Sequence, residues 1–349
     1  MTDVFARVSD AWVGASGDPN NPPPTEQPRW AGHVVDRVLL GMCVQTGASP
    51  TLSYATAVTY TGAPYARRSF GGGNWITANA INSWIDECEA DSIYPWISFK
   101  VPGNDWAGVV NGQYDSGLNI ILERAAARSE TWMFTVHHEP SGDGPIGDPA
   151  NNRADQLANL ELWGDMQTYV SNYVASASDK VCFAPIMNGF PWGPKNYDAA
   201  AIAAAYPQSL IDTINANGHI LTCDTYDSAD NTKLSYTSYD RTSLKMSGFF
   251  DWCRANGVQS AGIGEWGCHT GEDVRRCWNL CATNSDLVGI SVYFNSGANS
   301  RANWLLVPDA FDTADNTLDG TAESELRMDY FILALAASAT ANPATVAAI

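Results

Sequence analysis

The sequence lacks several features that would place it in a common class of proteins. Its 349 residues contain only 19 lysines and arginines against 38 aspartates and glutamates, a formal net charge of −19. A protein with this charge repels DNA, RNA and anionic membrane surfaces, so we expect no nucleic-acid partner. No apolar run approaches the roughly 20 residues that a membrane helix needs. We therefore expect no membrane insertion either.

The first residues, MTDVFARVSDAWVGASGDP, show neither the basic segment nor the apolar segment of an export signal. The eight cysteines include no CxxC pair, which disfavours a zinc ribbon. An even number of cysteines suits a disulfide framework in a short secreted protein, but several of these lie in apolar runs, where a thiol behaves as a small hydrophobe. We expect buried free thiols, with one or two disulfides left open, and no cofactor.

One organisation repeats along the chain after a lead-in, residues 1–33, that contains the Pro/Asn-rich stretch GDPNNPPPTEQP. Short apolar runs typical of buried strands lie at residues 37–44, 65–70, 93–99, 131–136, 181–187, 219–224, 259–264 and 287–294. Helix-like segments lie between them at residues 77–90, 108–127, 151–177, 199–218, 241–257 and 271–284. Eight strands in alternation with helices predict an α/β protein, a single (β/α)8 TIM barrel over residues 34–337, followed by a tail at 338–349. An open doubly wound sheet is the competing fold, but its phosphate-binding signal GxxxxGK[ST] is absent.

In such a barrel the active site forms where the strands end. Glu139 follows the fourth predicted strand and Glu265 ends the seventh, and these strand ends face each other across the barrel mouth. Hydrolysis of a glycosidic bond with retention needs two carboxyl groups about 5–5.5 Å apart, one protonated and one ionised. The pair therefore predicts a glycoside hydrolase, although a single glutamate at a strand end is often only a capping or solvated residue.

Other strand ends supply candidate substrate-binding residues. They are Arg68, Lys100, His137, His138 and Tyr226, together with the tryptophans Trp75, Trp106, Trp192 and Trp266, which follow strands in Gly- and Pro-rich loops. A tryptophan face can stack on a sugar ring, although each of these rings could equally be a packing residue. The two histidines could bind a metal, but the HxH signal of barrel metallohydrolases is missing from the first strand, so we expect no metal.

These residues resemble the clan-A glycoside hydrolases, and the histidine before the first glutamate resembles family 26, the β-mannanase group. The resemblance spans about residues 34–335 and implies that Glu139 is the acid/base and Glu265 the nucleophile. It further implies that His138 lies near the sugar and that Tyr226 holds the nucleophile. Arg68 resembles the arginine that this clan has at the end of the second strand. The run PSGDGPIGD after Glu139 replaces the tryptophan-rich run of family 26, so mannan itself is not implied.

The sequence thus predicts a retaining glycoside hydrolase, and a non-catalytic glycan-binding barrel is the alternative. With only Arg68 and Lys100 as basic residues at the rim, the expected substrate is a neutral cell-envelope or capsular polysaccharide. Five lysines against 14 arginines, with abundant alanine and glycine, resemble the minor tail proteins of phages that infect actinobacteria. That resemblance implies a place on the virion, with other tail proteins as candidate partners; a cytoplasmic glycosidase is the alternative.

Overall fold

The structure is a computed structural model that describes residues 29–30, 33–34, 38–44, 65–70, 78–90, 94–127, 132–227, 241–268, 270–295, 330–331 and 333–334. Near its start, β1 (Arg29–Trp30) pairs antiparallel with β2 (His33–Val34), so the predicted boundary between lead-in and barrel falls within β2. The predicted tail lies outside the described residues.

The strands of the main sheet begin and end close to the predicted runs. They are β3 (Leu39–Val44), β4 (Tyr65–Phe70), β5 (Tyr94–Phe99), β6 (Trp132–Val136), β7 (Val181–Phe183), β8 (Ile186–Asn188), β9 (Leu221–Tyr226), β10 (Ala261–Gly267) and β11 (Val288–Asn295). Every neighbouring pair in this sheet is parallel. Parallel strands covered on both faces read as continuous apolar runs, which is why they were visible in the sequence.

The sheet closes through a split strand. Its order is β7-β6-β5-β4-β3-β11-β10-β9-β8, and the two end strands are the halves of the predicted fifth strand. Pro185 lies between them and has no N–H to continue the ladder. The ladder is nevertheless bridged, because the Ile220 N–H donates to the Phe183 carbonyl (3.2 Å) and the Thr222 N–H donates to the Pro185 carbonyl (3.0 Å). The predicted (β/α)8 barrel is therefore confirmed.

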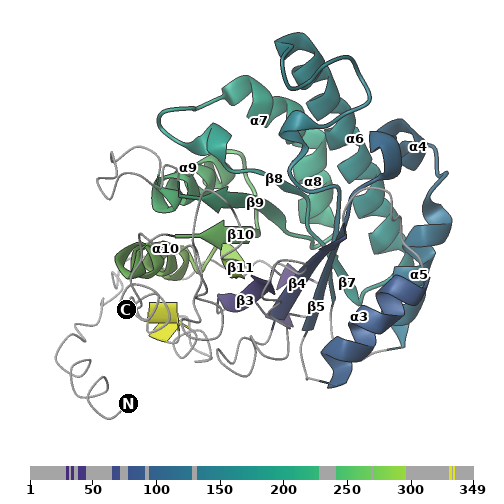
Figure 1. The fold of residues 1–349 in the computed structure, drawn as a ribbon, viewed down its shortest axis with the longest axis horizontal. Coiled ribbons are helices and arrows are strands. Elements are labelled where there is room, and N and C mark those ends of the chain that lie inside the picture. Colours follow the sequence, from purple (N-terminus) through teal and green to yellow (C-terminus); the bar gives the residue numbers. More distant parts are fainter. Residues whose placement is uncertain are drawn as a thin grey trace, which may run out of the picture.

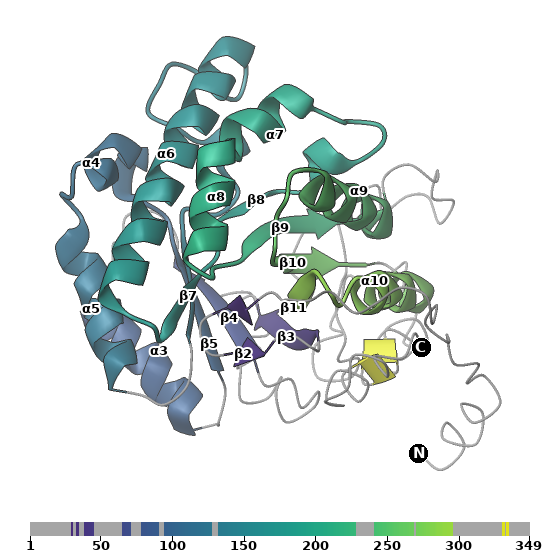
Figure 2. The same ribbon diagram turned by 180° about the vertical axis from the view of Figure 1, so that it is seen from behind.

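The described helices lie outside the strands (Figures 1 and 2). They are α3 (Ala78–Ala90), α4 (Trp106–Val110), α5 (Asp115–Ala126), α6 (Arg153–Ala177), α7 (Ala199–Ala205), α8 (Gln208–Ala216), α9 (Thr242–Ala255) and α10 (Gly271–Thr283). Two predicted helices are each divided: the first at a turn that contains Gly112 (φ 75°), the second at Pro207. None of the helices in the described ranges is long and apolar enough to cross a membrane.

Side chains that alternate along the strands form two cores. The barrel interior is filled by Leu39, Cys43, Trp96, Met133, Cys182, Ala184, Ile186, Ile220, Ile290 and Val292. A larger cluster, including Trp84, Trp163 and Trp278, packs between strands and helices. All eight cysteines are buried free thiols, which confirms the expectation from their apolar surroundings. The Sγ atoms of Cys268 and Cys277 are 3.5 Å apart.

Candidate active site

A β-bulge decides which way Glu265 points. The pairing of β10 with β9 shifts between Ile263 and Glu265, and the pairing with β11 shifts between Ile263 and Trp266. Ile263 packs in the outer core, whereas Glu265 lies two residues later yet contacts Cys43 of the barrel interior. A bulge re-aims side chains in this way and is frequent beside active sites. The extra residue in β10 therefore turns Glu265 inward.

The glycine inside this bulge has no room for a side chain. A Cβ on Gly264 would lie 2.5 Å from Asp224 Oδ1 and 2.8 Å from Ile186 Cδ1. Gly262, Gly264 and Gly267 also have the spacing GxGxxG, which in a dinucleotide-binding fold lies in the turn between a strand and a helix. Here all three belong to β10, so the spacing does not indicate a nucleotide site.

Both carboxylate oxygens of Glu265 accept a hydrogen bond. Tyr226, the last residue of β9, donates its hydroxyl to Oε2, and the Cys43 thiol at the end of β3 lies 3.3 Å from Oε1. Burial raises the pKa of Tyr226 well above its usual value, and the charges of Glu265, Asp224 and Glu139 raise it further. The phenol therefore stays protonated and remains a donor to the carboxylate.

Glu139 lies close enough to act on the same phenol. It follows β6 in the left-handed region (φ 54°, ψ 61°), and its N–H donates to the Ile186 carbonyl of β8 (3.0 Å). His137 is also left-handed (φ 52°). Residues other than glycine rarely adopt this conformation, and each costs on the order of 1–3 kcal/mol unless its surroundings enforce it. Such strain is frequent at active sites.

Side chains of α6 hold the backbone where β6 ends. The Trp163 indole N–H donates to the His137 carbonyl (2.7 Å), and the Gln167 amide donates to the Val136 carbonyl (2.8 Å). The two donors are four residues apart and so share one helix face. They satisfy carbonyls that the turn toward Glu139 removes from the ladder, and this stabilises the left-handed backbone.

His137 belongs to this support rather than to a sugar-binding surface. Its side chain is fully buried, so the expected contact with substrate is corrected. Its Nδ1 accepts the Val101 N–H (3.1 Å), which leaves the ring proton on Nε2, 3.1 Å from Asp143 Oδ2. Burial lowers the pKa of His137, while the hydrogen bond to Asp143 opposes that shift. A neutral imidazole thus ties β5 to the loop that follows Glu139.

Lys100 binds the same carboxylate, since its Nζ lies 2.7 Å from Asp143 Oδ2. The hydrogen bond from His137, followed by the hydrogen bond and charge of Lys100, lowers the pKa of Asp143 to about 2 against the opposing effect of burial. The sequence predicts Lys100 at the rim. The structure pairs it with Asp143, which the sequence reasoning did not identify. His138 is half-buried and hydrogen-bonds through Nδ1 to Ser98 Oγ (2.8 Å).

Three of the predicted sugar platforms are buried packing residues, which corrects the expectation for them. The Trp106 ring meets His137 edge-on (4.8 Å between centroids), Trp192 packs on Phe249 (4.9 Å), and Trp266 on Tyr293 (4.8 Å). Their exposed fractions are 0%, 2% and 1%. The bulge that turns Glu265 inward turns Trp266 outward. Trp75 lies outside the described residues.

The register of β4 separates its two arginines. Arg67 pairs with Cys43 of β3 and Trp96 of β5, both in the barrel interior. Arg68 pairs with Ile97, which belongs to the outer core. Paired residues in neighbouring strands share a face of the sheet. The backbone register therefore aligns Arg67 with interior residues and the predicted Arg68 with a residue of the outer core; both side chains lie outside the described part of the structure.

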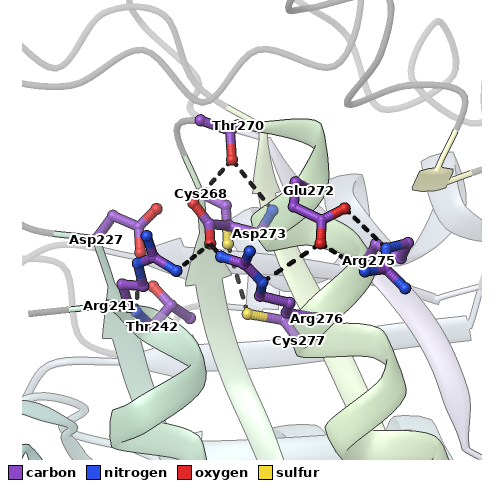
Figure 3. Close-up of polar contacts among 10 residues, drawn as sticks. All are labelled: Asp227, Arg241, Thr242, Cys268, Thr270, Glu272, Asp273, Arg275, Arg276 and Cys277. Carbon is purple, nitrogen blue, oxygen red and sulfur yellow. Dashed lines mark hydrogen bonds and ion pairs between the residues drawn. The ribbon is translucent and has the colours of Figure 1, made fainter. Parts of the chain in front are cut away.

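Polar contacts behind the site fix the ends of β9 and β10 (Figure 3). Thr242 at the start of α9 donates its N–H to Asp227 Oδ1 (2.8 Å) and its hydroxyl to the Gly267 carbonyl (3.0 Å). On α10, Arg276 Nη1 lies 2.9 Å from the buried Asp273 Oδ1. Gly267 lies two residues beyond Glu265, so the bond from Thr242 holds the strand end that presents Glu265.

Within the described residues, no group of three or more His, Cys, Asp and Glu side chains could hold a metal ion. The sequence reasoning missed Cys43, Asp224 and Asp143 as members of the site. The first two end or nearly end predicted strands, so their position was a usable signal. The partners of Asp143, by contrast, depend on how the loop after β6 folds back on β5.

No protein-family model matches the sequence, and no curated protein matches it either. Solved structures with a similar fold include a GH5-4 broad-specificity endoglucanase from Clostridium longisporum (TM-score 0.55, 10% identity, covering 90% of this chain and 100% of that one). A Bacteroides ovatus GH5 xyloglucanase (0.55, 12%, 92% and 79%) and a Cellulomonas fimi endo-β-1,4-mannanase (0.51, 13%, 90% and 75%) are also similar. At these identities the likeness shows the barrel fold.

Proposed function

We propose that the protein is a retaining glycoside hydrolase in which Glu265 is the nucleophile and Glu139 the acid/base. One observation carries the proposal: Glu265 of β10 and Glu139 of the loop after β6 lie close to one phenol, Tyr226, which donates a hydrogen bond to Glu265. Paired carboxyl groups at the end of a barrel are the apparatus of glycosidic-bond hydrolysis. The endoglucanase, xyloglucanase and mannanase named above, which share the fold, support the same class of reaction.

The proposed reaction has two steps. In the first, a carboxylate oxygen of Glu265 bonds to the anomeric carbon, the bond to the leaving oxygen breaks, and protonated Glu139 gives its proton to that oxygen. In the second, ionised Glu139 takes a proton from water, the water oxygen bonds to the anomeric carbon, and the ester to Glu265 breaks. Two inversions give net retention, and the pair is restored.

The surroundings suit these roles. Tyr226 fixes one oxygen of Glu265 through its hydroxyl, so the attacking carboxylate cannot rotate freely. The left-handed backbone at Glu139, held by the contacts of His137 and Asp143, sets the direction of its side chain. His138 is half-buried beside Ser98 and is the histidine that we propose contacts the sugar.

We propose a neutral polysaccharide of a bacterial envelope or capsule as the substrate. The carboxyl groups of Glu139, Asp224 and Glu265 gather around Tyr226, and Lys100 is already paired with Asp143. An anionic polymer would be repelled by such a site, whereas a neutral one would not, and hydrolysis should change little between low and high salt. Within the same proposal, the enzyme belongs to a phage tail, where it meets the polymer outside the host. The low lysine content supports this location.

The test is digestion of a panel of neutral polysaccharides, namely galactan, arabinan and mannan, with a polyuronate beside them. Release of reducing ends is measured for wild type, Glu265→Gln, Glu139→Gln and the matched control Glu161→Gln, which alters an exposed glutamate on α6. We expect wild type and the control to release sugar equally, and the two site variants to lose at least about 10²-fold in rate. Wild type that binds a polymer without cleaving it would replace the proposal by the non-catalytic glycan-binding barrel.

A further inference from the structure

The second donor to Glu265 is a thiol. Cys43 is the fifth residue of the six-residue strand β3, its side chain is 4% exposed, and its Sγ lies 3.3 Å from Glu265 Oε1. An ionised carboxylate only accepts hydrogen bonds, so the proton in this contact belongs to sulfur. Tyr226 donates to the other oxygen. The carboxylate of Glu265 is thus held by one donor from β3 and one donor from β9.

We propose that Cys43 is a positioning residue, whose thiol orients the carboxylate of Glu265. The inference rests on the proposed function, because it assigns Cys43 a part in preparing the nucleophile. A donor on each oxygen restricts rotation of the carboxylate, and a nucleophile held in one orientation reacts faster than one that rotates. Removing the thiol therefore lowers kcat and leaves KM near its wild-type value.

The contact between Cys43 and Glu265 belongs to a polar group at the strand ends. Tyr226 and Asp224 from β9 and Glu139 from the loop after β6 gather with Glu265. Cys43 and Tyr226 donate hydrogen bonds to its two carboxylate oxygens. Among the described side chains of β11, Phe294 packs its ring on Tyr226.

The strand geometry keeps the thiol in place. Cys43 belongs to the interior cluster that contains Leu39 and Trp96, and its backbone is paired on both sides, with Phe294 of β11 and Arg67 of β4. A residue in the middle of a parallel sheet moves little, so a short side chain here gives a well-defined donor position.

The kinetic test compares Cys43→Ala and Cys43→Ser with wild type on the polymer that wild type hydrolyses. Cys182→Ala is the matched control, because Cys182 lies in the same interior cluster and its Sγ hydrogen-bonds to backbone groups of Phe183 and Ile220. We expect kcat to fall about 2- to 10-fold in Cys43→Ala, the worth of one such hydrogen bond, while KM stays near its wild-type value. In Cys43→Ser, which restores a donor, and in the control, kcat should stay near its wild-type value.

A second measurement needs no turnover. The infrared S–H stretching band of Cys43, isolated as wild type minus Cys43→Ala, should move to higher frequency in Glu265→Gln, because a neutral amide accepts more weakly than a carboxylate. An unmoved band shows that the thiol does not donate to Glu265 and overturns the proposal. A moved band with an unchanged kcat in Cys43→Ala reduces the contact to packing and also overturns the proposal. Wild type that cleaves no glycan removes the proposed function itself, whereas active wild type with an unchanged kcat in Cys43→Ala removes only the role of Cys43.

Discussion

Asp143 offers the sharpest test of how the loop carrying Glu139 is held. We consider Asp143→Asn, which keeps the shape and one acceptor oxygen but removes the charge. The wild-type carboxylate receives both the His137 Nε2–H and the Lys100 ammonium. The variant keeps an acceptor for the imidazole, but it leaves Lys100 without a counter-charge.

The magnitude follows from the pKa of Asp143, which is lowered from 3.8 to about 2. At 1.36 kcal/mol per unit this corresponds to about 2.5 kcal/mol. The side chain is 32% exposed, so solvent screening reduces the net stabilisation to about 1–1.5 kcal/mol. Because the folded-state pKa is the lower one, this stabilisation is complete above the unfolded value and is lost as the pH falls through 3.8 toward 2.

Urea unfolding followed by tryptophan fluorescence measures this difference. Asp143→Asn should be less stable than wild type by about 1–1.5 kcal/mol at neutral pH, and the gap should shrink steadily at acidic pH. Asp165→Asn, which alters an exposed aspartate of α6, is the control and should leave the free energy of unfolding unchanged. A gap that is absent at neutral pH, or that stays constant across the acidic range, would refute the ion-pair reasoning.

Three further predictions concern other parts of the barrel. Gly264→Ala should lower the hydrolytic rate by about 10²-fold, because its Cβ would displace Asp224 and the bulge that aims Glu265; an unchanged rate would show that the bulge is tolerant. Arg67→Ala should reduce activity more than Arg68→Ala, as the register of β4 indicates, and the reverse order would contradict that register. Burial lowers the pKa of His219 to about 4, so wild type should lose stability as the pH falls from 6.5 toward 4; urea unfolding of His219→Gln should show a flatter dependence, and parallel curves would contradict this.

The fold could be predicted from the sequence because its strongest signals are local. Most of the strand runs are apolar, as buried parallel strands require, and the segments between them read as helices. The two elements that differ from the prediction also carried local signals in the sequence, which the prediction did not use. Pro185 splits the fifth strand, and Pro207 divides the helix predicted over residues 199–218. In both cases a missing backbone N–H ends the element.

The site was harder to predict from the sequence, because the direction of a side chain depends on how its strand pairs with distant strands. The GIGEWG stretch does not reveal that a bulge separates Ile263 from Glu265, and the bulge alone sends Trp266 into the outer core. Likewise, two adjacent histidines after β6 look equivalent in sequence, yet the left-handed turn buries His137 and leaves His138 half-buried. Position at a strand end was enough to find Glu139 and Glu265 as candidates, and their catalytic roles stay predictions.

The most direct test of the central claim is to trap the covalent intermediate. A 2-deoxy-2-fluoro glycoside of the sugar released from the polymer, with a dinitrophenolate leaving group, slows the second step more than the first, so the glycosyl ester accumulates. Mass spectrometry of peptic peptides should find the added sugar on the peptide that contains Glu265 in wild type, and none in Glu265→Gln. A protein that hydrolyses the polymer but carries the label on another carboxylate, such as Asp224, or forms no ester and inverts the anomeric centre, would contradict the account.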